Sequence, residues 1–180
     1  MGAPHNKERY GELWDQHRVS VYLQEMEAFR DLVVFSGGLA WHFMSPVGHA
    51  ELKHAHDHKD ADWMVPPQNV ADAVTRLLER GFTRVWTRYD RLLSVEEFRR
   101  YEKVVEAEGE KPMRVTIDFF VKDVPSIEVR GYRVVEPKTL LSYYGVIHSS
   151  DKCFAVQAAT KLIARGIDPV GRPELVTIPK

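Results

Sequence analysis

The sequence predicts an α/β (α+β) fold, in which a mixed β-sheet is flanked by helices and further helices lie at the C-terminal end. Two observations lead to this prediction. Short apolar runs rich in β-branched residues, such as 33–35 and 113–121, alternate with runs whose apolar residues recur every three or four positions. Glycine and proline separate most of these runs. Strands and helices mixed in this order are typical of α/β and α+β domains.

The size and composition of the chain fit one globular domain. At 180 residues we expect a single domain over 1–180, with a core at about 20–165, a polar lead-in at 1–17 and a tail at 167–180. No apolar run approaches the ~20 residues that cross a bilayer, and the N-terminus has no apolar leader. The single cysteine, Cys153, fits a reducing compartment. These features predict a cytoplasmic protein with no membrane partner.

In the first half of the chain, helices and short strands are expected to alternate. Ser20 is a suitable N-cap for a helix that extends to about Leu32. The Gly37-Gly38 turn should end one strand and begin a short helix. Gly81 should follow the C-terminus of a longer helix. The expected elements are a helix at 20–32, a strand at 33–35, a helix at 39–44, a strand at 61–65, a helix at 69–80 and a strand at 82–88.

The second half begins with a predicted helix. Ser94 and Glu97 resemble a capping box, which predicts a charged helix to about Glu108. The clearest strand, 113–121, follows, and 127–135 is expected to form a further strand or a hairpin bent at Gly131. Two helices are expected to close the chain, at 137–144 and 150–165.

Three aspartates are the candidate catalytic and metal-binding residues. Asp60 and Asp62 are two positions apart at the start of a predicted strand, so their side chains should lie on the same face. Asp118 lies inside the 113–121 strand. If the two strands are neighbours, the three carboxylates meet. Such a group suits Mg²⁺ or Mn²⁺, because hard cations prefer oxygen ligands, and two ions can stabilise a phosphoryl displacement.

A turn of small residues is the candidate phosphate-binding element. Ser36, Gly37 and Gly38 follow a predicted strand and begin a predicted helix. Glycine allows backbone N–H groups to approach phosphate oxygens closely, and the start of a helix carries a partial positive charge.

Taken together, these residues resemble the nucleotidyltransferase superfamily with the DNA polymerase β-like fold. The resemblance covers about 33–165 and rests on Gly-Gly, then Asp-x-Asp on a strand, then a distant third Asp. The later Pro137 and Leu140-Leu141 run and the lysine-bearing helix are similar to the small stand-alone members, which include aminoglycoside nucleotidyltransferase-like and toxin-type proteins. The nucleotide-binding residues that follow are Ser36, Gly37, Gly38, Lys59 and Lys152.

The resemblance implies that an NMP is transferred from an NTP, with ATP as the expected donor, to a hydroxyl acceptor, with release of pyrophosphate. The acceptor is a small molecule, a protein side chain or an RNA end. The net charge of −1 argues against a long nucleic acid. Because the core is small, a homodimer is one way to complete the acceptor site.

Two alternative functions stay open. A histidine-rich loop with His49, His54, His56 and His58 precedes Asp60, and it suits a His/Asp metal-dependent hydrolase as well as a polar surface loop. The fold is also compatible with a non-catalytic regulatory module of a toxin–antitoxin type system.

Several of these residues also have structural interpretations. Asp118 would be stabilised by an ion pair with Arg114, Arg84 or Arg88 if it were purely structural. The tryptophans Trp41, Trp63 and Trp86 are expected in the core.

Overall fold

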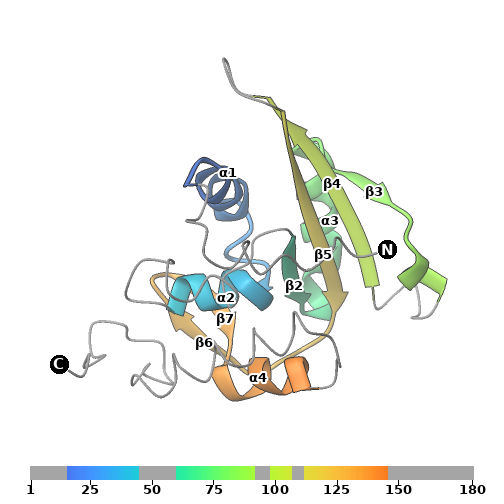
Figure 1. Ribbon diagram of the computed structural model, residues 1–180. Helices are drawn as coiled ribbons and strands as arrows, with labels where there is room; N and C mark the ends of the chain where they lie inside the picture. The colour runs from blue at the N-terminus through green and yellow to red at the C-terminus, as the bar shows by residue number, and fades with distance from the viewer. Residues whose placement is uncertain (1–15, 45–59, 92–97, 107–111, 146–180) are drawn as a thin grey trace.

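A computed structural model of the chain describes residues 16–44, 60–91, 98–106 and 112–145. Within these residues it contains a seven-stranded mixed sheet with helices packed around it (Figure 1), so the α+β architecture predicted from the sequence is confirmed. The strand order is β3-β4-β5-β2-β1-β7-β6. Among the described residues, none of the helices has the length and apolar character needed to cross a membrane.

The sheet combines parallel and antiparallel pairs. Its strands are β1 (Val34–Phe35), β2 (Ala61–Val65), β3 (Thr83–Val85), β4 (Phe98–Val105), β5 (Met113–Val121), β6 (Ser126–Val129) and β7 (Tyr132–Val135). The β2–β5 and β1–β7 pairs are parallel. The β1–β2, β3–β4, β4–β5 and β6–β7 pairs are antiparallel. β2 and β5 are therefore interior strands, each with a neighbour on both sides.

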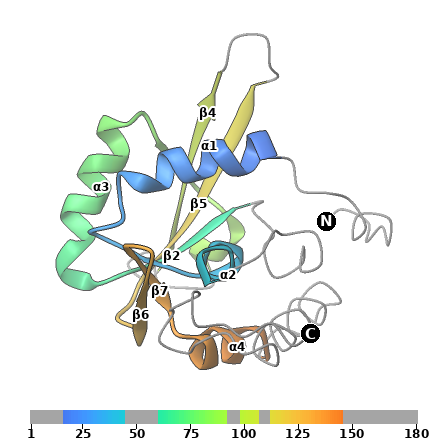
Figure 2. The same cartoon turned by 90° about the vertical axis from the view of Figure 1, so that its left-hand side faces the viewer.

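The helices are α1 (Gln16–Glu27), α2 (Gly37–Met44), α3 (Val70–Glu79) and α4 (Pro137–Gly145), with two short 3₁₀ helices, η3 (Pro67–Asn69) and η4 (Arg88–Arg91). Figure 2 shows α1 lying across β4 and β5. Tyr22 of α1 accepts a hydrogen bond through its hydroxyl from the backbone N–H of Thr116 in β5 (3.1 Å), and Glu25 accepts one from Lys103 Nζ in β4 (2.7 Å). These contacts hold α1 against the central sheet.

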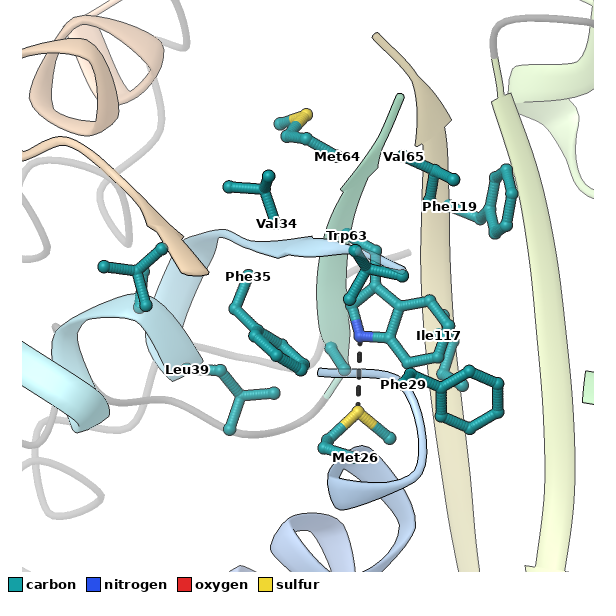
Figure 3. Close-up of a cluster of buried hydrophobic side chains, with 14 of the residues drawn as sticks. Met26, Phe29, Val34, Phe35, Leu39, Trp63, Met64, Val65, Ile117 and Phe119 are labelled. Carbon is teal, nitrogen blue, oxygen red and sulfur yellow. Dashed lines mark hydrogen bonds between the residues drawn. The ribbon is translucent and has the colours of Figure 1, made fainter. Parts of the chain in front are cut away.

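The core is centred on Trp63 of β2 (Figure 3). Its indole N–H donates a hydrogen bond to Met26 Sδ at 3.3 Å. The ring of Phe29 lies 4.7 Å from the Trp63 ring, and Phe35 of β1 approaches its edge at 6.3 Å. All four side chains are fully buried. Burial of three aromatic rings against one another supplies much of the apolar stabilisation of this layer.

Most elements near the core lie where the sequence predicted them. The 61–65 strand, the helix that begins at the glycines, the 113–121 strand and the 137–144 helix are confirmed within one residue or two. Of the two possibilities for 127–135, the structure has the hairpin, formed by β6 and β7, and Gly131 at its turn has φ of +81°. The predicted helix at 150–165 lies outside the described residues.

The predicted helix from Ser94 to Glu108 is wrong. Its described residues form β4, which pairs with β3 on one side and with β5 on the other. Charged residues and a capping-box pattern favour a helix locally, but the backbone of β4 is hydrogen-bonded on both sides within the sheet. Phe98 and Tyr101 are buried against Phe120 and Phe119 of β5. Tertiary pairing therefore overrides the local preference.

The predicted boundaries of two elements are also wrong. The first helix spans Gln16–Glu27, so Ser20 lies inside it and is not its N-cap, and the helix ends five residues before the predicted limit at Leu32. The third strand ends at Val85, because the Asp90 carboxylate accepts hydrogen bonds from the backbone N–H and the hydroxyl of Thr87 (2.6 and 3.0 Å) and holds a tight turn there. Trp86 in this turn is 68% exposed, whereas Trp41 and Trp63 are buried as predicted.

Replacing Phe29 with alanine should destabilise the protein by about 3–5 kcal/mol, because the change leaves a cavity beside Trp63 in a fully buried layer. Urea denaturation followed by circular dichroism measures this loss. The matched control is Leu78→Ala on α3, where the side chain is 57% exposed, and it should change stability by less than about 0.5 kcal/mol. Equal losses for the two variants would contradict the packing described here.

Candidate functional site

Asp62 and Asp118 lie side by side in the sheet. In the parallel β2–β5 pair, Asp62 is the register partner of Asp118. Neighbouring strands are about 4.8 Å apart, and register partners direct their side chains to the same face. The condition on which the sequence-based site depends, that these two strands are neighbours, is therefore met.

Asp60 lies on the same face. It comes immediately before β2, two positions before Asp62, and strand alternation places both side chains on one side. The Nη2 atom of Arg100, which binds Asp118, is also 3.8 Å from Asp60 Oδ2. The three predicted carboxylates thus gather around one end of β2.

Gly37 supports the Asp62 carboxylate directly. Its φ of +54° is in the left-handed region, which side chains rarely adopt. A Cβ atom at this position would lie only 2.0 Å from Asp62 Oδ2. The absence of a side chain at Gly37 therefore makes the space in which the Asp62 carboxylate lies. This close approach links the predicted glycine turn to the predicted acidic group.

Ser36 joins the turn to the neighbouring strand. It is buried, and its backbone N–H donates a hydrogen bond to the carbonyl oxygen of Asp62 at 2.8 Å. Its own carbonyl oxygen accepts one from Ala40 N–H at 3.2 Å, at the start of α2. The Ser36 N–H is therefore already hydrogen-bonded within the fold. The other two residues of the predicted phosphate-binding turn, Gly37 and Gly38, lie in the first turn of α2.

The sequence reasoning missed one member of the site, Arg100 of β4. Arg100 is the register partner of Asp118, and its guanidinium binds that carboxylate through two hydrogen bonds, from Nε to Oδ1 (2.6 Å) and from Nη2 to Oδ2 (2.7 Å). The hydrogen bonds to Asp118 raise the pKa of Arg100, against the opposing effect of burial. The positively charged guanidinium of Arg100 therefore lies against the carboxylate group and pairs with Asp118.

The ion-pair partners suggested for Asp118 from the sequence are wrong. Arg84 binds the buried carboxylate of Asp90 at 2.6 Å. Arg114 lies 3.5 Å from Glu102. Arg88 belongs to η4 rather than to the third strand, so it does not share a strand face with Arg84.

The donor set fits a hard divalent cation. Carboxylate oxygens are the ligands that Mg²⁺ and Mn²⁺ prefer, and the space at Gly37 holds one of them at the turn. In the part of the chain that the structure describes, no three Asp, Glu, His or Cys side chains are already grouped as metal ligands. Asp118 is bound to Arg100 instead. Mg²⁺ binding stays a prediction, with Asp60, Asp62 and Asp118 as its candidate ligands.

Several predicted residues lie outside the described part of the chain. They are the nucleotide-binding candidates Lys59 and Lys152 and the histidines His49, His54, His56 and His58.

Comparisons with known proteins bear on the fold alone. No protein-family model matches the chain, and no curated protein matches it. A solved structure that is similar is the crystal structure of JHP933 from Helicobacter pylori, with a TM-score of 0.55 and 11% sequence identity. The similarity covers 83% of this chain and 68% of that one. The α+β arrangement described above is thus shared with a protein of very different sequence.

Replacing Gly37 with alanine should both strain the backbone and displace the Asp62 carboxylate. Gly81→Ala is the matched control, because Gly81 also has positive φ (+83°) but has no atom within 4 Å of an added Cβ. Gly81→Ala should cost about 1–2 kcal/mol from backbone strain alone. Gly37→Ala should cost at least ~1 kcal/mol more, because a close contact is added. Chemical denaturation measures both, and equal losses would contradict the close approach of Gly37 to Asp62.

Proposed function

We propose that the protein is a nucleotidyltransferase dependent on Mg²⁺ or Mn²⁺. It would transfer an NMP group from an NTP, with ATP as the expected donor, to a hydroxyl acceptor and release pyrophosphate. The observation that carries this proposal is the register pair of Asp62 and Asp118, with the Asp62 carboxylate lying against Gly37 at the start of α2. The similarity of the sequence pattern to the nucleotidyltransferase superfamily adds to it.

The three aspartates have the chemistry that such a transfer requires. Asp60, Asp62 and Asp118 would hold the divalent cations, which neutralise charge on the phosphates and lower the pKa of the acceptor hydroxyl. The acceptor oxygen forms a bond to the α-phosphorus, and the bond from that phosphorus to the bridging oxygen of pyrophosphate breaks. Asp118 would act as a metal ligand or as the general base that receives the hydroxyl proton.

The glycine turn suits the leaving part of the donor. Gly37 and Gly38 present backbone without side chains at the first turn of α2, where free N–H groups and the helix dipole favour phosphate oxygens. Lys59 and Lys152 are the predicted lysine contacts of the same triphosphate. The turn is therefore assigned to the negatively charged phosphates of the donor, and the carboxylates are assigned to the positively charged metal ions bound to those phosphates.

The acceptor class is left open by these residues. A small molecule, a protein side chain or an RNA end are all compatible with a site made of carboxylates, and a second copy of the chain would supply a further wall. The net charge of −1 argues against a long nucleic acid.

Asp62→Asn should abolish metal-dependent nucleotide binding, because it removes the negative charge held against Gly37 while keeping the shape of the side chain. Thermal unfolding is measured with each of the four NTPs, with and without Mg²⁺ or Mn²⁺. A nucleotide at ~100 times its Kd stabilises the wild type by about 2.7 kcal/mol. We expect this shift with at least one NTP, only with metal, and not in the variant.

Asp72→Asn is the matched control. Asp72 is an exposed carboxylate in the first turn of α3, and its variant should keep the full nucleotide-dependent shift. Wild-type protein that shows no shift with any NTP and either metal would rule out the proposed donor site. A shift that Asp62→Asn retains would place the nucleotide elsewhere on the protein.

A further inference from the structure

We infer that Arg100 is a substrate-positioning residue that exchanges partners: it binds Asp118 before the metal arrives and binds the triphosphate afterwards. This inference rests on the proposed function and adds to it a residue that the sequence pattern does not identify.

The first state is the one seen in the structure. The guanidinium of Arg100 binds both oxygens of Asp118, at 2.6 and 2.7 Å, and its Nη2 atom is 3.8 Å from Asp60 Oδ2. A metal ion that uses Asp118 needs at least one of the same oxygens, and its double positive charge repels the guanidinium at such short range. A metal ion and the bidentate guanidinium of Arg100 therefore compete for the Asp118 carboxylate.

The second state follows from where the released guanidinium can go. The core layer around Trp63 lies on the opposite face of the sheet, since Tyr101, Ile117 and Phe119 alternate with Arg100 and Asp118. The Arg100 side chain is already 24% exposed on the carboxylate face. The anionic groups that arrive there with the metal are the phosphates of the donor. Arginine binds phosphate with the same two-pronged geometry that it uses for a carboxylate.

Other basic residues of the neighbouring strands are engaged elsewhere. Arg84 binds Asp90, Arg114 pairs with Glu102, and Lys103 binds Glu25. Arg99 lies over the ring of Phe119, which belongs to the core face. Within the described residues of β3, β4 and β5, Arg100 is thus the basic side chain that contacts the carboxylate group.

The exchange couples the two ligands. Without nucleotide, a metal ion has to displace Arg100, so the arginine weakens the binding of metal alone. With nucleotide, the displaced arginine gains a phosphate partner, so the same residue strengthens the binding of the metal–nucleotide complex. Removing the guanidinium should therefore change the two affinities in opposite directions.

The test compares Arg100→Met, Arg100→Lys and the wild type. The binding of Mn²⁺ alone is followed by electron paramagnetic resonance of the free ion, and the binding of the NTP is then measured at saturating Mn²⁺. Arg100→Met should bind Mn²⁺ alone about tenfold more tightly and the NTP about tenfold more weakly. Arg100→Lys keeps the positive charge but cannot make a bidentate contact. Its affinities should lie between those of Arg100→Met and the wild type in both measurements.

Arg114→Met is the matched control, because Arg114 also pairs with a carboxylate across β4 and β5 but is 66% exposed and binds Glu102. It should leave both affinities unchanged. Circular dichroism confirms that each variant is folded, and Arg100→Lys carries the test if Arg100→Met is not. Weaker binding of Mn²⁺ alone in a folded Arg100 variant would overturn the exchange, since it would make Arg100 a support of the metal site.

Failure of this inference and failure of the proposed function give different results. Wild-type protein that binds no NTP at saturating Mn²⁺ defeats the proposed function and the inference together. Wild-type protein that binds an NTP with an affinity that Arg100→Met leaves unchanged defeats only the contact between Arg100 and the phosphates.

Discussion

Like charges on neighbouring strands are the constraint around which the central part of this sheet is arranged. The parallel pairing of β2 with β5 places Asp62 next to Asp118, and two carboxylates at that separation repel each other unless a positive charge lies close by. Two neighbouring features answer this constraint. Gly37, the first residue of α2, leaves space for the Asp62 carboxylate, and Arg100 binds the Asp118 carboxylate from the other side. The start of α2 and the adjoining strands β2, β5 and β4 therefore bring together the glycine turn, both acids and the arginine that is their counter-ion.

The parts of the fold that the sequence predicted well are those whose local pattern and tertiary role agree. The 61–65 and 113–121 strands are largely apolar and lie inside the sheet, and Gly37 has a positive φ that few residues other than glycine adopt. The prediction of a helix in place of β4 is wrong because the sequence pattern there is ambiguous. Phe98, Tyr101 and Val105 recur every three or four positions, as on a helix, yet Phe98 and Tyr101 are buried on opposite faces of a strand that lies between two others. Only pairing with β3 and β5 decides between the two structures.

The same error concealed part of the candidate site. The three aspartates and the glycine turn were identified because acid pairs and Gly-Gly turns are short, local patterns, and the structure brings Asp60, Asp62, Asp118 and Gly37 together. Arg100 has no such local pattern, and its position opposite Asp118 depends on the β4–β5 register. One signal was present in the sequence: the turn-forming residues at 108–112 separate two runs that contain β-branched and aromatic residues, which is typical of a hairpin. That interpretation would have placed 98–105 beside 113–121.

The strand order has a consequence for how the protein is made. Asp62 pairs with a strand that begins about 50 residues later in the chain, at Met113, and the counter-ion of that strand comes from β4 in between. A nascent chain that has emerged from the ribosome only as far as residue 90 carries the glycine turn and the first two acids but neither Asp118 nor Arg100. Pairings of such long sequence separation form late and slowly during folding. The acidic group is thus completed only after β5 has been synthesised, so an incomplete chain on the ribosome lacks the paired acids of the finished sheet.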